Sequence, residues 1–524
     1  MDVPTRVPPQ AGSTRVVLDG TGLGLSGLIR LADGTADPVV DPAALDRVRR
    51  ARETADRLAA TGRWYGRGTG VGAHRSVPVD AADETAHGLR LLRSHAGGAG
   101  ALLPARPVRA MLAVRANQLL AGGSGIHPSF VTALTDALRL GVHPAVNEYG
   151  AVGTGDLTAL AQTGLTLLGE RPWLTARGCS RTCGCAAWAR ATTDPRSAED
   201  SHPHGGMPHH DLPEPTTLRP GDALALLSSN ALALAQAALA AHETGLLLRA
   251  THAVAALSLA AVSGSPEAYA APVHALRPYP GPARAAAEVR RLLGMPDHPS
   301  GPGRRIQDPY GFRAFPQVHG AALEASDALC RIVEAEINCP SENPLLTPDG
   351  RLYHHGGFFA AHLALALDGL NLALLKTAQL SAARLTALSR TDLTGLPAFL
   401  ATGPDGSSGA MILEYTANSA LSDLRSSAAA PAFAGHVVLS DGLEEAAAFA
   451  GQAARQTQRA TAAYTTTLAC ELVAAVRALR LHPAPPAVPA LTLAAAALPT
   501  PTEDRPLSGD ITAAAELLPR LAEL

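Results

Sequence analysis

The chain has 524 residues, of which 47% are apolar, so it can bury a large core and is not a single small domain. A net charge of −3 gives no sign of a nucleic-acid partner, and six cysteines in this length do not form a disulfide scaffold. The first residues lack the apolar stretch of a signal peptide, and no apolar run approaches the ~20 residues of a membrane span. We therefore expect a cytoplasmic protein without a membrane partner.

Residues 1–220 are predicted to form an N-terminal domain of mixed structure. Its first part, 16–80, alternates short apolar runs with Gly-rich turns, and the segment YGRGTGVG at 65–72 must be a loop. Over 82–140 the apolar residues recur at three- and four-residue spacing, which indicates helices. A Gly-rich break then leads into a helix predicted over 156–168 and capped by its first residue.

The end of this domain, 171–220, is a polar, Pro-rich loop that holds cysteines and histidines at short spacing. These residues are Cys179, Cys183, Cys185, His202, His204, His209 and His210. Thiolates and imidazoles can bind Zn²⁺, but the spacing is not that of a standard zinc finger. We therefore favour a polar loop over a metal site.

The rest of the chain is dominated by Ala/Leu-rich helical stretches. They span 221–262, 319–337, 359–390, 410–430 and 441–480. Helices that are apolar nearly all round belong in the centre of a bundle or in a subunit interface. The sequence thus predicts a mostly α protein with a central bundle over 221–480. A Pro-rich tail with a short helix is predicted to follow over 481–524.

Gly153-Thr154-Gly155 stands just before a predicted helix. A small-hydroxyl-small tripeptide can cyclise, because the amide nitrogen of the third residue can attack the carbonyl of the first, and the middle residue then loses water. An unhindered glycine makes this approach without a side-chain clash, and a helix N-terminus favours an electron-poor group. The alternative is an ordinary Gly-rich turn, which is common.

The segment QDPYGFR runs from Gln307 to Arg313. Pro309 predicts a turn or a helix start, and Tyr310 and Arg313 share one helical face because they are three residues apart. Arginine offers a fixed fork for a carboxylate, and tyrosine offers a phenol that can transfer a proton. The alternative is a surface turn with an ordinary arginine.

Three further side chains are candidates. Tyr65 lies in the Gly-rich loop, where a tyrosine with a lowered pKa can act as a general base. His95 lies in an apolar helical run. Glu444 and Glu445 lie in a predicted apolar helix, where only one of two adjacent carboxylates can face the core; burial would raise its pKa. A lone loop tyrosine or helical histidine is, however, more often a packing residue.

These segments recur in one order, and through them the chain resembles the aromatic amino acid ammonia-lyases, among them histidine ammonia-lyase. The matching stretches are YGRGTGVG (65–72), LRSHAGGAG (92–100), VRANQLLAGGSGI (114–126), GTGDLTALAQTGLTLLGE (153–170), QDPYGFRAFPQVHGA (307–321), ENPLL (342–346), GGFF (356–359) and SSGAMI (407–412). The resemblance implies a long-helix bundle of the ammonia-lyase and fumarase-like type.

The resemblance also implies a chemistry without an external cofactor. In the family the cyclised tripeptide is a methylidene-imidazolone, an electrophile that turns the amino group of the bound amino acid into a leaving group. A loop tyrosine removes the β-proton, and ammonia departs to leave an α,β-unsaturated acid. By this resemblance Tyr65 is the base, Tyr310 the second tyrosine and Arg313 the carboxylate clamp. The resemblance further implies a homotetramer whose sites draw on three subunits.

The remaining contacts with a small amino acid or its derivative follow from the same resemblance. Gln307 falls on a polar contact, His95 on the position that marks histidine selectivity, and Glu444 on an acid that touches the substrate. Ser228 and Phe359 complete the predicted substrate-binding residues.

Three positions depart from the family pattern. The tripeptide is Gly-Thr-Gly where the family has Ala-Ser-Gly, and dehydration of Thr154 would place a methyl group on the carbon that must be attacked. Ser228 stands where the family has asparagine, with Asn230 two residues further on, and Phe358 also replaces an asparagine. Three changes around one site argue for altered chemistry.

Three functions therefore stay open. The first is a carbon–nitrogen lyase acting on a histidine-like or aromatic amino acid. The second keeps the fold but lacks the electrophile, and uses tyrosine and glutamate acid–base chemistry for cyclisation or elimination on a specialised metabolite. The third is a non-catalytic ligand-binding or partner subunit, against which the retention of Tyr65, Tyr310 and Arg313 argues. We rank the first above the second, and both above the third.

Overall fold

The computed structural model describes residues 14–175, 212–299 and 305–524, so the Cys/His positions of the predicted polar loop lie outside the described residues. The chain divides into two compact units. The first comprises Met1–Leu239, Arg331–Ala364 and Ala432–Gln452, and the second comprises Ala240–Cys330, Leu365–Pro431 and Ala453–Leu524. The three consecutive domains expected from the sequence stay a prediction.

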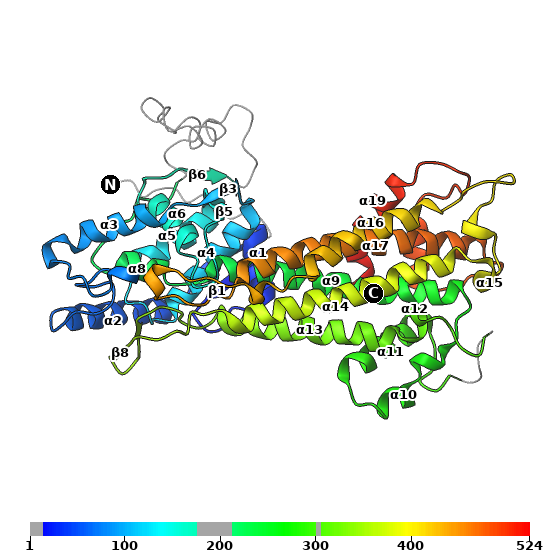
Figure 1. The fold of residues 1–524 in the computed structure, drawn as a ribbon, viewed down its shortest axis with the longest axis horizontal. Coiled ribbons are helices and arrows are strands. Elements are labelled where there is room, and N and C mark those ends of the chain that lie inside the picture. The colour runs from blue at the N-terminus through cyan, green and yellow to red at the C-terminus, as the bar shows by residue number, and fades with distance from the viewer. Residues whose placement is uncertain (1–13, 176–211, 300–304) are drawn as a thin grey trace. The chain divides into compact units, whose positions relative to one another are not determined.

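The first unit is built around α4 (Ala105–Leu120), a helix that is buried on nearly every side. Its apolar residues lie all round the helix, and every residue over 108–120 is buried. Helices α1 and α5 pack against α4, and α3 packs against α6. The other helices of this unit are α1 (Leu25–Asp33), α2 (Pro42–Ala59), α3 (Glu84–His95), α5 (Ser129–Leu140), α6 (Leu157–Leu167) and α8 (Asp222–Leu227) (Figure 1).

The strands of the first unit are short and pair two by two. β1 (Thr14–Leu18) runs parallel to β2 (Ala36–Val40), with Thr14 opposite Ala36. The antiparallel pairs are β3 (Ala99–Leu102) with β5 (Asn147–Tyr149), β4 (Val142–Pro144) with β6 (Trp173–Thr175), and β7 (Leu345–Leu346) with β8 (Leu352–Tyr353). Because these strands have only two to five residues, the described chain is mostly helical, which confirms the predicted fold class.

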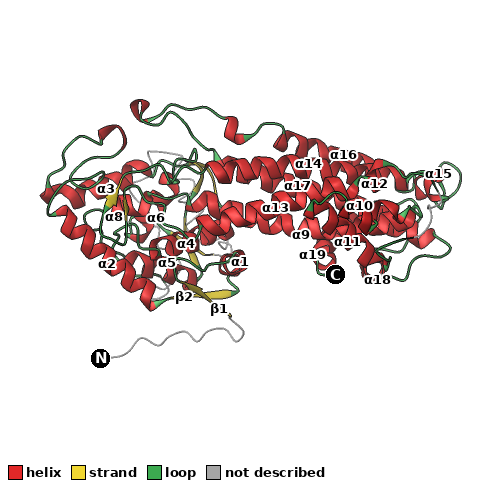
Figure 2. Ribbon diagram, turned by 90° about the horizontal axis from the view of Figure 1, so that it is seen from below, coloured by secondary structure: helices red, strands yellow, loops and turns green. Residues whose placement is uncertain are grey.

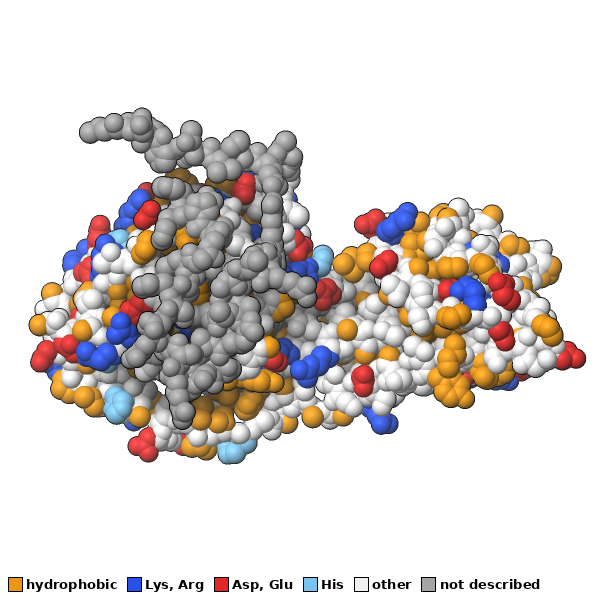
Figure 3. All heavy atoms as spheres, turned by 90° about the horizontal axis from the view of Figure 1, so that it is seen from above, with side chains coloured by type: hydrophobic (Ala, Val, Ile, Leu, Met, Phe, Trp, Pro, Cys, Tyr) orange, Lys and Arg blue, Asp and Glu red, His pale blue; other side chains and the backbone are white. Residues whose placement is uncertain are grey.

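The second unit is a bundle of long helices that run side by side (Figures 1 and 2). Its long helices are the parts within this unit of α9 (Ala231–Ala261), α13 (Phe315–Glu336), α14 (Ala361–Leu388) and α17 (Ala450–Leu481). The shorter helices are α10 (Ala271–Ala275), α11 (Pro280–Leu293), α12 (Tyr310–Arg313), α15 (Thr391–Thr394), α16 (Ile412–Ala428), α18 (Pro489–Ala497) and α19 (Ser508–Leu521). On the face shown in Figure 3, acidic and basic side chains are interspersed over these helices.

A buried ion pair joins two helices of this bundle. Arg384 of α14 donates to both carboxylate oxygens of Glu471 of α17, with Nε–Oε1 and Nη2–Oε2 distances of 2.6 and 2.8 Å. The hydroxyl groups of Ser258 and Ser381 donate to the same two oxygens at 2.7 and 2.6 Å. Arg384 also donates to the carbonyl of Gly311 in α12 at 3.1 Å. The pair is therefore well satisfied, and it fixes the backbone of the short helix α12.

Two predicted helices differ from the observed ones. The stretch 221–262 is broken into α8 and α9 at Ser228, whose ψ of 72° is not helical. The stretch predicted over 441–480 begins only at Ala450. Phe449 has a φ of 51°, and Leu439 pairs with Glu444 in an isolated β-bridge, so the segment before Ala450 cannot continue the helix.

Three helical stretches are long and apolar enough to cross a membrane by length and composition alone, and the expectation that none would approach that length was wrong. They are Asp222–Ala261, Ala361–Leu388 and Ala450–Leu481. In the first and third, 89% and 78% of the most apolar window is buried inside the protein, against 50% in the second. Packing within the protein therefore accounts for most of the apolar surface of the first and third.

Candidate functional site

The tripeptide 153–155 forms a tight turn in the first unit. Its two glycines have φ values of 88° and 119°, in the region that favours glycine. The Phe449 amide donates to the carbonyl of Val152 at 2.8 Å, so the turn lies against the backbone that precedes α17. A Cβ atom on Gly153 would lie 2.6 Å from the Phe449 nitrogen. Position 153 therefore requires glycine for two reasons, its dihedral angle and this close approach.

Three hydrogen bonds join the turn to the start of α9. The Gly155 amide donates to Oδ1 of Asn230 at 3.1 Å, and the Asp156 amide donates to the carbonyl of Ser229 at 2.7 Å. The Ala233 amide donates to Oδ2 of Asp156 at 2.8 Å. The Asp156 side chain thus satisfies an amide in the first turn of α9 and makes no cap hydrogen bond in α6, which corrects the predicted capping.

Asn230 is the site residue that the predicted set left out. It is 5% exposed, and its Nδ2 atom donates to the carbonyl of Phe358. An asparagine at a helix start usually caps its own helix. Here the Ala233 amide donates its hydrogen bond to Asp156, and the Asn230 side chain accepts one from Gly155 of the tripeptide. The sequence contained a signal for this residue. The resemblance implies an asparagine at position 228, and Asn230 stands two residues further on.

Ser228 and Phe359 make other contacts. The Ser228 hydroxyl oxygen accepts a hydrogen bond from the Asn343 amide at 2.9 Å. The Phe359 amide donates to the carbonyl of Gly356 at 3.0 Å, within the loop before α14. Both side chains are half-buried, and their predicted contact with a substrate stays a prediction.

Glu444 is aimed at the tripeptide. The Thr154 hydroxyl donates to its Oε2 atom at 3.1 Å, and the Ser440 hydroxyl donates to Oε1 at 3.2 Å. Contrary to the prediction, Glu444 does not lie on a helix but in the loop before α17, whereas the neighbouring Glu445 is exposed. In this loop the Glu444 carboxylate points toward the tripeptide, and the Glu445 side chain stays at the surface.

Tyr65 lies in the predicted Gly-rich loop, with its phenol oxygen accepting a hydrogen bond from the Gly72 amide at 2.9 Å. Burial raises the pKa of the Tyr65 phenol, and the negative charge of Glu444 raises it further, while the Gly72 hydrogen bond and the charge of Arg75 act in the opposite direction. The net effect is a raised pKa, so the phenol is protonated at neutral pH. The lowered pKa expected of a resting general base is not found.

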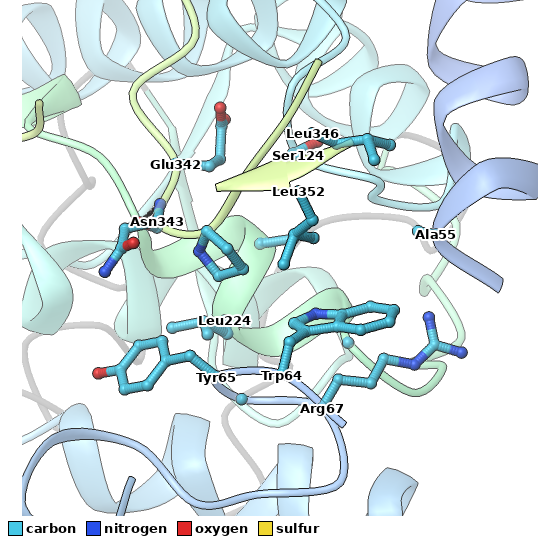
Figure 4. A pocket seen from close by; sticks show the side chains of 15 residues that line it. Ala55, Trp64, Tyr65, Arg67, Ser124, Leu224, Glu342, Asn343, Leu346 and Leu352 are labelled. Carbon is cyan, nitrogen blue, oxygen red and sulfur yellow. Dashed lines mark hydrogen bonds between the residues drawn. The ribbon is translucent and has the colours of Figure 1, made fainter. Parts of the chain in front are cut away.

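A small cavity of about 40 Å³ lies beside this loop in the first unit. Trp64 and Leu352 face each other across it, and the Tyr65 side chain extends away from Trp64 (Figure 4). The volume is far below the roughly 300–1,000 Å³ of ordinary small-molecule sites. This cavity by itself is therefore smaller than an ordinary small-molecule site.

A buried ion pair supports the chain beside this cavity. Arg115 of α4 donates to Oε1 of Glu342 at 2.9 Å, and it also donates to the carbonyls of Ala225 and Leu226. The Oε2 atom of Glu342 has no hydrogen-bond partner within the described residues. The pair fixes the end of α8, from which the chain continues to Asn230.

Gln307, Tyr310 and Arg313 belong to the second unit. Pro309 precedes α12, as its sequence predicts, and the guanidinium carbon of Arg313 lies 4.3 Å from the centre of the Tyr310 ring. Tyr310 is 67% exposed, and the buried Nε atom of Arg313 has no hydrogen-bond partner among residues of the described chain. The predicted shared face of Tyr310 and Arg313 is thus observed, and Gln307 is exposed before the helix.

His95 is the last residue of α3 and is half-buried. Its Nδ1 atom lies 2.9 Å from the Leu91 carbonyl and 3.1 Å from the Ser94 hydroxyl. A proton on Nδ1 that is donated to the carbonyl leaves Nε2 as the acceptor in the neutral ring. Within the described residues, His95 thus has Nδ1 engaged in its own helix and no hydrogen bond at Nε2.

Comparison with known proteins gives consistent relatives over the whole chain. A sequence profile described as "Aromatic amino acid lyase" matches residues 23–498. Histidine ammonia-lyase from Symbiobacterium thermophilum is 34% identical over 507 residues, which cover 95% of this chain and 96% of that protein. The crystal structure of histidine ammonia-lyase from Trypanosoma cruzi superposes with a TM-score of 0.83 at 28% identity, covering 96% of this chain and 93% of that one.

A second solved structure carries a different enzyme name. Tyrosine aminomutase from Streptomyces globisporus superposes with a TM-score of 0.84 at 26% identity, covering 97% of each chain. The same fold is therefore found in proteins named for elimination and in proteins named for amino-group migration.

Proposed function

The chain belongs to the aromatic amino acid lyase family and is a carbon–nitrogen lyase, and we propose that it eliminates ammonia from a histidine-like or aromatic amino acid to give an α,β-unsaturated acid. The observation that carries this proposal is the convergence on the tripeptide turn. Thr154 donates to Glu444, and Gly155 donates to Asn230, from segments far away in the sequence. Tyr65 is near enough for the charge of Glu444 to raise its pKa.

The residues of the turn fit the electrophile that the family forms autocatalytically without an external cofactor. The Gly155 nitrogen must lose its proton when it bonds to the Gly153 carbonyl carbon. Oδ1 of Asn230 accepts a hydrogen bond from this N–H group. The Thr154 hydroxyl, which would leave as water, is bound by Glu444. Closure of the ring and dehydration of Thr154 release two water molecules in total. The resulting group would supply an electron-poor carbon that makes the amino group of the substrate a leaving group.

The same proposal assigns roles to Tyr65, Arg313 and His95. Tyr65 removes the β-proton, and because its pKa is raised in the resting site, the phenol must first pass its own proton to another group or to solvent. Arg313, stacked on Tyr310 and without an ion pair among described side chains, holds the substrate carboxylate. His95 offers a ring nitrogen to a histidine-like side chain.

The proposal includes a homotetramer in the cytoplasm. The 40 Å³ cavity beside Tyr65 is far smaller than an ordinary small-molecule site, so this cavity by itself does not enclose a substrate. A site completed by neighbouring subunits would supply the missing walls. Sedimentation of the purified protein tests this part, and a monomer with full turnover would contradict it.

An intact mass of the purified protein tests the electrophile. We expect the mass to fall short of the plain sequence by two water molecules, and the Thr154→Ala variant to have the plain mass of its own sequence and no turnover. Thr154→Ser should keep both the mass deficit and the turnover, since it removes only a methyl group. The matched control is Thr132→Ala on an exposed face of α5, which should keep the deficit and the activity.

The second candidate function uses the same fold without the electrophile. It is favoured by the protonated phenol of Tyr65 and the negative charge of Glu444, an acid and a base within one electrostatic environment. Its chemistry would be cyclisation or elimination on a specialised metabolite. A plain intact mass together with turnover that survives in Thr154→Ala would select this function over the first.

A further inference from the structure

A cavity in the second unit is lined by none of the residues assigned a role in the proposed reaction. It has a volume of about 350 Å³, within the roughly 300–1,000 Å³ range of small-molecule sites. Four elements of the same unit form its walls, namely α9, α11, α13 and the end of α19. We refer to this cavity as the bundle recess.

The inner wall of the bundle recess is apolar. Leu248, Leu323 and Leu521 line it and are each at most 5% exposed. His252 of α9 packs edge-on against the ring of His319 of α13, with a centroid distance of 4.6 Å. Burial lowers the pKa of His252 to about 4, so this ring is uncharged at neutral pH. The inner wall therefore suits a hydrocarbon or aromatic group.

Gly245 keeps one side of the recess open. Glycine within a helix costs about 1 kcal/mol relative to alanine, so a packing reason is expected for it. None is found at this position, because a Cβ atom on Gly245 would meet only the Arg249 guanidinium, at 3.6 Å. The missing side chain leaves space that opens into the recess.

The rim of the recess carries three guanidiniums, and two of them are paired with carboxylates of the same rim. Arg284 pairs with Asp327 at 2.8 Å, and Arg291 pairs with Glu288 at 2.7 Å. Arg249, also on the rim, has no ion pair within the part of the chain that the structure describes. A guanidinium binds a carboxylate through two parallel hydrogen bonds.

From this arrangement we propose that the bundle recess is a binding site for a small monocarboxylate with an apolar body, held by Arg249 at the rim and by the leucines of the inner wall. An aliphatic and an aromatic acid share this chemistry. No residue of the tripeptide turn lines the recess, and every lining residue belongs to the second unit.

Calorimetric titration of the full-length protein with octanoate and with 3-phenylpropionate tests the proposal. We expect saturable binding of at least one acid, and which one binds tells an aliphatic ligand from an aromatic one. 1-Octanol, which lacks the charge, should bind at least about tenfold more weakly. Arg249→Gln should weaken the acid by a similar factor. The matched control, Arg520→Gln on the exposed face of α19, should leave the affinity unchanged.

A second variant locates the ligand. Gly245→Phe fills the recess without changing its charge, and it should abolish binding while leaving Arg249 in place. Circular dichroism of each variant checks that the helices are retained. The proposal is overturned if neither acid binds, if octanol binds as well as octanoate, or if Gly245→Phe binds the acid with wild-type affinity. None of these results depends on whether the tripeptide forms an electrophile.

Discussion

Both units contain a buried arginine–glutamate pair, and the two pairs differ in how fully their charges are satisfied. Glu471 in the second unit receives two hydrogen bonds from Arg384 and one from each of two serines. Glu342 in the first unit receives one from Arg115, and its second oxygen has no partner among described atoms. The first unit therefore holds its site with a less complete polar network than the one that joins the long helices.

The backbone also differs between the tripeptide turn and the helices joined by Arg384, although Ser263, Phe399 and Leu400 of the second unit have positive φ as well. In the second unit, α14 and α17 are regular helices joined by side chains. In the first unit, the tripeptide lies in a turn with positive φ at both glycines, and it contacts a loop in which Ser440, Asp441 and Phe449 also have positive φ. Strained or unusual backbone is tolerated where the surroundings hold it in place, and it concentrates at functional sites. The complete ion-pair network thus lies between regular helices, and the incomplete one lies in the unit that holds the irregular tripeptide turn.

The largest expected effect comes from neutralising one carboxylate in each pair. Glu471→Gln leaves the fully buried Arg384 without a counter-charge, and we expect a loss of about 3–5 kcal/mol in the free energy of unfolding. Glu342→Gln should cost less, about 1–3 kcal/mol, because Arg115 keeps the carbonyls of Ala225 and Leu226. Urea unfolding measures both. Asp83→Asn, in an exposed pair, is the control and should not move the midpoint. Equal losses for the two buried variants would contradict the comparison.

Gly153→Ala tests the strain at the turn. The positive φ and the close Phe449 nitrogen should together cost about 1–3 kcal/mol of stability and remove most of the activity. Gly141→Ala is the matched control, since Gly141 has a φ of 72° but nothing within 4 Å of its built Cβ. If the two variants lose the same free energy of unfolding, the close approach of the Phe449 nitrogen adds no strain at position 153.

Glu444→Gln should shift the pH dependence of kcat/KM. A phenolate base gives activity that rises with pH through the pKa of Tyr65, and the negative charge of Glu444 raises that pKa. Removing the charge lowers the pKa, so the rising limb should move to lower pH, even though the lost substrate contact reduces the rate. The exposed neighbour gives the control, because Glu445→Gln should leave the limb in place. An unshifted limb in Glu444→Gln would mean that Tyr65 is not the group that titrates.

The smallest effect is a gain of stability in the second unit. Gly245→Ala should stabilise α9 by about 0.5–1 kcal/mol, because the position has helical backbone and open space. Gly320→Ala in α13 is the opposite case, since its Cβ would lie 2.2 Å from the Pro282 nitrogen, and it should destabilise. Thermal unfolding of the two variants distinguishes them. A loss of stability in Gly245→Ala would show that the bundle recess is less open than described.

Local patterns determined a large part of this protein. The apolar periodicity of 82–140 and the Ala/Leu-rich stretches after residue 221 predicted helices, and the structure has helices there, with a break at Ser228 and a later start at Ala450. The Gly-rich segments at 65–72 and 153–155 predicted turns, which the structure contains. Pro309 likewise marked the start of α12. These features depend on residues within a few positions of one another, so the sequence carries the whole signal.

Contacts between distant segments decided the rest. The Gly155 amide binds Asn230, 75 residues away, and the Thr154 hydroxyl binds Glu444, 290 residues away. The Asp156 side chain likewise binds an amide of α9 instead of capping α6. Glu444 lies in a loop, where it pairs with Leu439 in a β-bridge. The raised pKa of Tyr65 depends on burial and on a carboxylate from another part of the chain. No local pattern encodes such pairings, because hydrogen-bond geometry and electrostatic fields depend on distance in space and not on separation along the chain.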